Sequence, residues 1–221
     1  MPAKSSRRQD TDTNSILNIN QSERLPGSRY ALFLCLAVGG VLLDLVTKSA
    51  IFHYYFEPEN WGHVAQQPAW LIDGIFGIQC SLNPGALFGM GQGYSSVFAA
   101  ISFVAIFGIV VWLFVFKQAW DRWLTIAFGL ITGGILGNLY DRLGLGYLST
   151  YPEEIRDNVR DWILFRLQGV PFFDPWPNFN IADSLLVTGA MMLFVQTFFE
   201  ATKQTSDGND QEQHEEDEAH H

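Results

Sequence analysis

The sequence predicts an all-α membrane protein, a bundle of four transmembrane helices with a small extracytoplasmic β-sheet and loop cap. Two observations predict this fold class. A helix that crosses a bilayer needs about 20 predominantly apolar residues, and four stretches of the chain come close to that length. Aromatic side chains stand at the ends of these stretches, where the membrane interface favours them. The predicted helices cover residues 30–52, 94–117, 122–142 and 181–200.

Polar segments flank the predicted membrane domain, which covers residues 30–200. Residues 1–29 are rich in Ser, Asn, Arg and Gln, and residues 201–221 carry seven acidic side chains against one lysine. Segments of this composition cannot bury enough apolar surface to fold. We therefore predict a disordered N-terminal segment and a disordered acidic tail. The tail contributes −6 of the formal net charge of −10, and no nucleic acid partner is predicted.

The distribution of Lys and Arg predicts how the helices are oriented, because cytoplasmic loops carry an excess of these residues. Five of them precede the first helix, and Lys117 and Arg122 lie between the second and third helices. Residues 49–116 contain none. Both termini are thus predicted in the cytoplasm, and the loops 53–93 and 144–180 outside. Three arginines in the second outer loop reduce this contrast, namely Arg156, Arg160 and Arg166.

The first outer loop contains a candidate sheet followed by a turn. Residues 70–82 are apolar and in part β-branched, which favours short strands on the membrane surface. Asn83, Pro84 and Gly85 come next, and these residue types are typical of turns.

The third predicted helix carries a polar motif near its outer end. Asn138, Asp141 and Arg142 are spaced i, i+3 and i+4, which puts them on one helix face. Charged residues at membrane depth are costly and are functional candidates. The structural alternative is a helix-packing seam, with Gly133 and Gly137 as its small residues. We favour packing for the glycines and function for the polar motif.

The fourth predicted helix begins with a second polar motif, Asn180 and Asp183. Asn180 fits an N-cap and Asp183 the acidic position of a capping box, so capping alone also explains them. Asp141 lies at the same predicted membrane face, however, because one outer loop joins the two helices. Two neighbouring carboxylates share a proton, and such a pair can activate a water and protonate a leaving amine. Which of the two is the base stays open.

On the first predicted helix, Asp44 and Lys48 are spaced i, i+4 near the outer end. We interpret them as a local ion pair, with Lys48 reaching toward the interface. The five histidines are divided between the first outer loop and the acidic tail, so they provide no set of metal ligands. Neither a metal nor a cofactor is predicted.

These strings together resemble the lipoprotein signal peptidase family, signal peptidase II of bacteria. The resemblance spans roughly residues 30–200, with the strings in the family's order. They are Asp44-x-x-x-Lys48, Asn83-x-Gly85-Ala86-x-Phe88, Gly134-x-x-Gly137-Asn138-x-x-Asp141-Arg142, Val159-x-Asp161-Trp162-Ile163 and Phe179-Asn180-x-Ala182-Asp183.

The resemblance implies a membrane aspartic endopeptidase that removes the signal peptide from diacylglyceryl-modified prolipoproteins, ahead of the lipidated cysteine. It implies a monomer in the bacterial cytoplasmic (inner) membrane, in contact with lipid, with its active site at the extracytoplasmic face. Asp141 and Asp183 would be the catalytic pair. The residues that would shape the substrate site are Asn83, Gly85, Asn138, Arg142 and Asn180, supported by Asp44, Lys48 and Asp161.

The alternative function is a small membrane transporter or channel component, in which intramembrane Asp and Arg form an ion path. Four helices without internal repeats disfavour it. A membrane scaffold that docks partners through its acidic tail is a third possibility. A transporter needs charges through the depth of the membrane, whereas a hydrolase needs only the pair at the outer edge.

Overall fold

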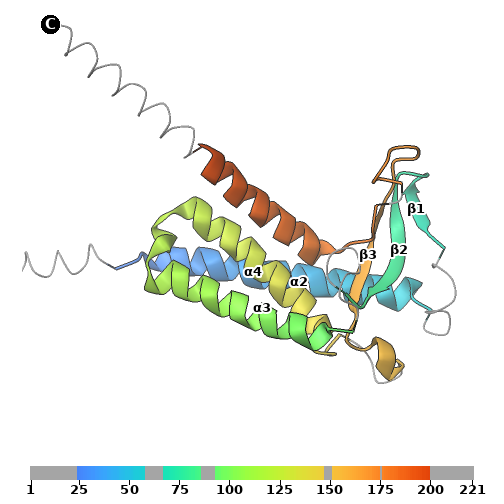
Figure 1. Cartoon of the computed structure of the whole chain (residues 1–221), viewed down its shortest axis with the longest axis horizontal. Helices are drawn as coiled ribbons and strands as arrows, with labels where there is room; N and C mark the ends of the chain where they lie inside the picture. The colour runs from blue at the N-terminus through green and yellow to red at the C-terminus, as the bar shows by residue number, and fades with distance from the viewer. Residues whose placement is uncertain (1–23, 58–66, 86–92, 147–150, 175, 200–221) are drawn as a thin grey trace, which may run out of the picture.

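The computed structural model describes residues 24–57, 67–85, 93–146, 151–174 and 176–199 (Figure 1). Within them, four helices are long and apolar enough to cross a membrane, which confirms the predicted fold class. Most of the predicted N-terminal segment and the whole predicted tail lie outside the described residues, so the division of the chain stays a prediction. The four helices are α2 (Gly27–Tyr55), α3 with its continuation η3 (Ser95–Val115), α4 (Arg122–Arg142) and the helix Ile181–Phe199, called the fourth span below.

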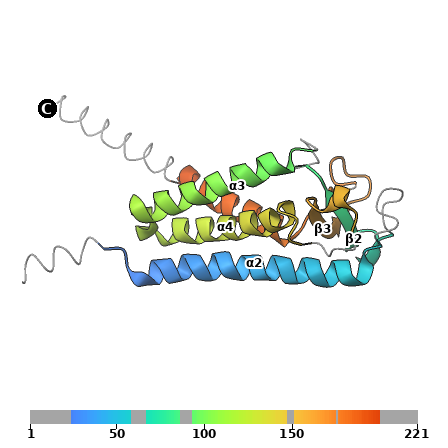
Figure 2. The ribbon, with the colours of Figure 1, turned by 90° about the horizontal axis from the view of Figure 1, so that it is seen from below.

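Glycines of α4 allow two neighbouring helices to approach it closely (Figure 2). A Cβ atom on Gly133 would lie 3.1 Å from the carbonyl oxygen of Ala37 in α2. A Cβ atom on Gly137 would lie 3.1 Å from the Cβ atom of Ala182 in the fourth span. Larger side chains here would force the helices apart, so packing is the correct interpretation of this glycine pair.

A short turn closes the end of the bundle where α3 connects to α4. Leu113 and Ala119 are completely buried there, packed with Phe33 of α2. The turn contains the 3-10 helix η4 (Gln118–Trp120). Asp121 then caps α4, because its side chain accepts hydrogen bonds from two N–H groups of the first helical turn.

A three-stranded antiparallel sheet lies at the opposite end of the helices, in the order β1-β2-β3 (Figures 1 and 2). The turn between the first two strands contains Gly74, whose φ of 71° favours glycine. The predicted sheet is confirmed, and it includes a third strand that comes from the second outer loop, after the 3-10 helix η5 (Glu153–Ile155). The strands are β1 (Ala69–Ile72), β2 (Phe76–Asn83) and β3 (Val159–Phe165).

The start of the fourth span is held between β3 and α2. The N–H of Ile163 in β3 donates to the carbonyl oxygen of Phe179 at 2.8 Å, and the N–H of Phe179 donates back at 3.2 Å. The backbone N–H of Ala182 donates to Oδ1 of Asp44 in α2 at 2.9 Å. These bonds bring a strand and two helices together at one end of the bundle.

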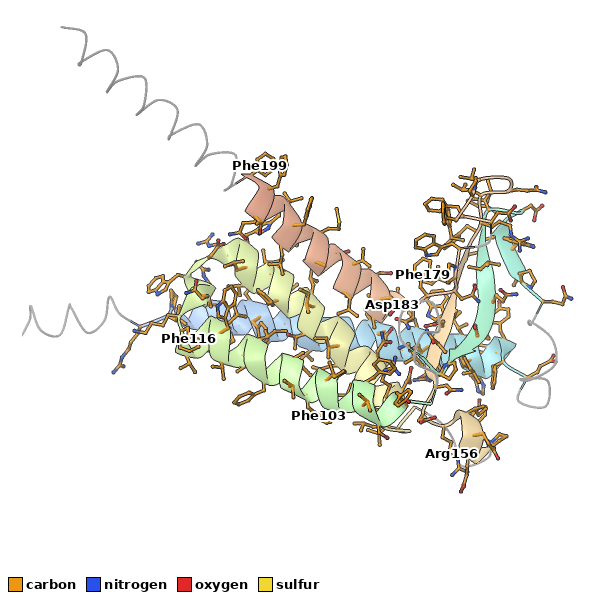
Figure 3. The ribbon with its side chains drawn as sticks, in the orientation of Figure 1. Phe103, Phe116, Arg156, Phe179, Asp183 and Phe199 are labelled. Atoms are coloured by element: carbon orange, nitrogen blue, oxygen red, sulfur yellow. The ribbon has the colours of Figure 1, made fainter. Side chains whose placement is uncertain are left out.

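Large apolar side chains cover the outside of the helices. Phe103, Phe116 and Phe199 point away from the bundle (Figure 3), and their exposed fractions range from 55% for Phe103 to 67% for Phe199. A helix that is apolar on its outer face as well as its inner face suits a lipid environment.

Candidate active site

Polar and charged side chains from four elements meet beside the sheet, where the fourth span begins near Phe179 and Asp183 (Figure 3). They come from α2, α4, β3 and the first turn of the fourth span. Burying a charge is costly unless it is paired and hydrogen-bonded. The partners of each side chain therefore indicate its role. The completely buried members are Asp44, Lys48, Asp141 and Asn180.

Asp44, Lys48, Asp141 and Arg160 form one buried ion cluster. Nζ of Lys48 lies 2.8 Å from Oδ2 of Asp44 and 3.1 Å from Oδ2 of Asp141. Nη2 of Arg160 lies 2.8 Å from Oδ1 of Asp141. Two carboxylates thus face two cations, and the formal charge of the cluster is zero. The predicted pair of Asp44 and Lys48 is present. The prediction that Lys48 reaches toward the interface is wrong. Its ammonium stays inside the protein, where it pairs with Asp141 and donates to Oδ1 of Asn138 at 2.9 Å.

Asp141 has both carboxylate oxygens fully occupied. Its Oδ1 accepts from Nε of Arg160 at 2.9 Å and also faces Nη2 of the same guanidinium. Its Oδ2 accepts from the backbone N–H of Arg160 at 3.1 Å and faces Lys48. Two cations and a backbone donor thus bind this carboxylate. A carboxylate held in this way joins elements together, and its oxygens are already engaged by protein groups.

Asp183 and Asn180 form the predicted capping box. The backbone N–H of Asp183 donates to Oδ1 of Asn180 at 2.9 Å, and the backbone N–H of Asn180 donates to Oδ2 of Asp183 at 3.1 Å. The other carboxylate oxygen of Asp183 accepts from Nδ2 of Asn138 at 2.8 Å. Asp183 is only half-buried, so this rigidly held carboxylate remains within reach of water.

Asp161 of β3 lies on the other side of Asn180. Its Oδ1 accepts from Nδ2 of Asn180 at 2.6 Å, and its Oδ2 accepts from Nδ2 of Asn83 at 3.2 Å. Burial raises the pKa of Asp161 well above its usual value, and the negative charge of Asp183 raises it further. Asn180 thus contacts both carboxylates, and these two carboxylates influence each other's protonation.

The loop after β2 is fastened to α4 beside these carboxylates. Nη2 of Arg142 donates to the carbonyl oxygen of Gly85 at 2.7 Å, and the N–H of Gly85 donates to Oδ1 of Asn83 at 3.0 Å. The Arg142 guanidinium also lies 4.8 Å from the ring centroid of Phe98 in α3. The structure therefore brings the predicted substrate residues to the site. Residues 86–89 of the predicted turn lie outside the described residues.

Comparison with known proteins establishes the family. A family model described as signal peptidase (SPase) II matches residues 36–199. The chain belongs to the signal peptidase II family. The lipoprotein signal peptidase of Rhodopirellula baltica is 51% identical over 179 residues, which cover 81% of this chain and 77% of that protein. The lipoprotein signal peptidase of Pseudomonas aeruginosa is 37% identical over 185 residues, which cover 82% of this chain and 92% of that protein.

The fold of this signal peptidase is also that of a solved bacterial membrane enzyme, with a TM-score of 0.62 and 23% identity. The match covers 81% of this chain and 93% of that chain. The resemblance found in the sequence, the aspartic endopeptidase activity and the role in lipoprotein processing are therefore confirmed. The transporter alternative is not supported. As a multi-span member of a bacterial signal peptidase family, the chain is consistent with an inner-membrane location.

In this signal peptidase, Asp141 and Asp161 have different partners. Asp141 is near the site, as predicted, but two cations occupy its oxygens. Among the described residues, no Lys or Arg forms an ion pair with Asp161, and the negative charge of Asp183 acts on it. Sequence reasoning included Asp161 only as a supporting residue. The sequence indicated a role for Asp161 only through its place in the family string Val159-x-Asp161-Trp162-Ile163.

Arg160 is a site residue that sequence reasoning missed. It was considered only as a positive charge in an outer loop, whereas its side chain is buried with 3% exposed. The residue shares no string with Asp141, so the sequence offered no sign of their contact.

Proposed function

We propose that this chain cleaves diacylglyceryl-modified prolipoproteins ahead of the lipidated cysteine, with Asp161 and Asp183 as its two catalytic carboxylates. This differs from the pairing of Asp141 with Asp183 that the sequence suggested. One observation supports the change above all others: Asn180 contacts both Asp161 and Asp183, while Asp141 is neutralised by Lys48 and Arg160. Because one chain carries both carboxylates, we further propose that the enzyme acts as a monomer.

The environments of the two carboxylates support a division of roles. Asp161 is buried and has a raised pKa, so it keeps a proton and acts as the general acid for the leaving amine. Asp183 accepts a backbone N–H at the start of a helix, where the helix dipole favours a negative charge. Its partial exposure suits a general base that takes a proton from the attacking water. Asn138, which donates to Asp183, keeps that carboxylate in one orientation.

The substrate assignment predicts a difference between two substrates. Purified enzyme in detergent should cleave a diacylglyceryl-modified prolipoprotein and leave the same prolipoprotein without lipid uncleaved. The site requires no metal ligand in this scheme, so cleavage should continue in EDTA. Mass spectrometry of the products would identify the cleaved bond. Equal cleavage of the unmodified protein, or activity that needs added zinc, would contradict the proposal.

If Asp161 is the protonated general acid, the pH profile of kcat/KM should shift in the Asn83→Ala variant. The Asn83 amide stabilises the ionised form of Asp161, so its removal raises the pKa of that carboxyl. A general acid is lost as pH rises through its pKa. The alkaline limb of kcat/KM should therefore move to higher pH in this variant. Asn178→Ala is the control, because Asn178 donates to the backbone of Gln79 instead. An alkaline limb that stays in place in Asn83→Ala would argue against Asp161 as the acid.

We also propose that the site faces the extracytoplasmic side. The sheet and the η4 turn lie at opposite ends of the helices (Figure 1), and the turn is flanked by Lys117 and Arg122. Both Asp73 and Gln118 are exposed. With Cys35 and Cys80 replaced by alanine, a cysteine at position 73 should react with a membrane-impermeant maleimide in intact spheroplasts. A cysteine at position 118 should react only after lysis. The reverse pattern would invert the topology.

A further inference from the structure

Arg160 contacts the site through three different groups. Its guanidinium holds Oδ1 of Asp141 through Nε at 2.9 Å and Nη2 at 2.8 Å. Its backbone N–H donates to Oδ2 of the same carboxylate at 3.1 Å. Its carbonyl oxygen accepts from Nδ2 of Asn180 at 3.4 Å. The residue that follows it in β3 is Asp161.

We propose that Arg160 is a positioning residue for peptide cleavage. By pairing with Asp141 it fixes β3 to α4, and this places Asp161 beside Asp183. This inference rests on the proposed pair of Asp161 and Asp183. Successive side chains of a strand point to opposite faces. Anchoring the Arg160 side chain on α4 therefore sets the direction in which Asp161 points.

The pairing of β3 with β2 is irregular next to Asp161. The pairing of β2 with β3 shifts between Ile78 and Ser81, which pair with Ile163 and Asp161 respectively. An irregular ladder leaves the strand locally less constrained. The irregularity adjoins Asp161. The contact of the Arg160 side chain with Asp141 adds a second attachment of β3 at this point, to α4.

The surroundings of the Arg160 guanidinium leave it little space to move. A Cβ atom on Gly146 would collide with Oδ1 of Asp141 and would lie 2.6 Å from Nη2 of Arg160. The ring of Phe52 in α2 lies 5.9 Å from the guanidinium carbon on another side. Two guanidinium nitrogens placed on one carboxylate oxygen in such a confined space define one geometry. Lysine cannot reproduce that geometry, because its ammonium is a single point of charge.

Arg160 also keeps the ion cluster neutral next to the catalytic pair. The charged groups that act on Asp161 are Lys48 of α2, Arg142 of α4 and Asp183. Lys48 in turn pairs with Asp44 and Asp141, and Arg160 pairs with Asp141. Without the Arg160 cation, the cluster carries one net negative charge. A buried negative charge favours protonation of neighbouring carboxyls. The loss of Arg160 should therefore shift the pH dependence of cleavage as well as its rate.

The test compares Arg160→Met and Arg160→Lys, with Arg166→Met as a matched control. Arg166 follows the same strand but pairs with Asp174, at 3.4 Å. We expect Arg160→Met to lower kcat by about 10²-fold, because a misplaced catalytic group loses that order of rate. KM should change little. The pH optimum of its residual activity should lie higher than that of the wild type. Arg160→Lys should restore the pH optimum and recover kcat only in part, and Arg166→Met should retain both.

Each result either supports or overturns this role. A wild-type kcat and pH optimum in Arg160→Met, or a change confined to KM, would overturn it. If Arg160→Met does not fold, Arg160→Lys decides: a wild-type kcat would show that the contact of two guanidinium nitrogens with Asp141 is unnecessary. Asp161→Asn in the same assays separates the two proposals. An active Asp161→Asn enzyme would refute the catalytic pair, whereas an inactive one beside a normal Arg160→Met would refute only the role of Arg160.

Discussion

Asp161→Asn and Asp183→Asn should each lower kcat by about 10²–10⁴-fold, the usual contribution of a general acid or base. Both variants should keep a melting temperature close to that of the wild type. Replacing either Asp by Asn keeps the shape of the side chain and one of its two accepted hydrogen bonds, and it introduces no charge into this largely buried site. Turnover of a diacylated prolipoprotein and thermal unfolding in detergent, measured on the same preparations, would test this.

Asp141→Asn is the matched comparison for the two catalytic variants. It removes the carboxylate that balances Lys48 and Arg160, which leaves excess positive charge in a buried cluster. This variant should therefore unfold at a clearly lower temperature, and its loss of activity should follow its loss of structure. A stable but inactive Asp141→Asn enzyme, together with an active Asp161→Asn enzyme, would return the catalytic role to Asp141.

The helices were predictable because the bilayer imposes a minimum apolar length on any segment that crosses it. The capping box was predictable for a similar reason, since its two members are three residues apart and both of its hydrogen bonds are local. Asn138, Asp141 and Arg142 also lie on the predicted part of α4. Local geometry was sufficient to place all of these residues at one end of the bundle.

The choice between Asp141 and Asp161 required long-range contacts that the sequence does not display. Asp161 reaches the site only because β3 pairs with β2, which places it opposite Ser81. β3 gave no clear alternating pattern, because most of its residues are buried. The partner of Asp141 is Arg160, which lies beyond a loop and looked like a surface charge. Two carboxylates at the same depth therefore looked equivalent until their partners were known.

Lys48→Met should destabilise the protein by about 3–5 kcal/mol, the usual cost of removing one partner from a buried ion pair. Lys48 is completely buried and contacts Asp44, Asn138 and Asp141. Methionine fills a similar volume but leaves Asp44 without its cation. Asp44 also accepts the backbone N–H of Ala182 in the fourth span, so strain at this carboxylate should loosen the contact between α2 and that helix. Thermal unfolding in detergent would reveal the loss.

The double variant Asp44→Asn/Lys48→Met distinguishes lost charge balance from lost packing. It removes one charge of each sign, so Asp141 and Arg160 remain as a neutral pair. The amide oxygen introduced by Asp44→Asn can still accept the N–H of Ala182. We expect the double variant to unfold at a higher temperature than Lys48→Met, and the two single substitutions to be non-additive. The cluster would not act as a neutral unit if the double variant were no more stable than Lys48→Met. In that case the packing of the lysine side chain would explain its effect.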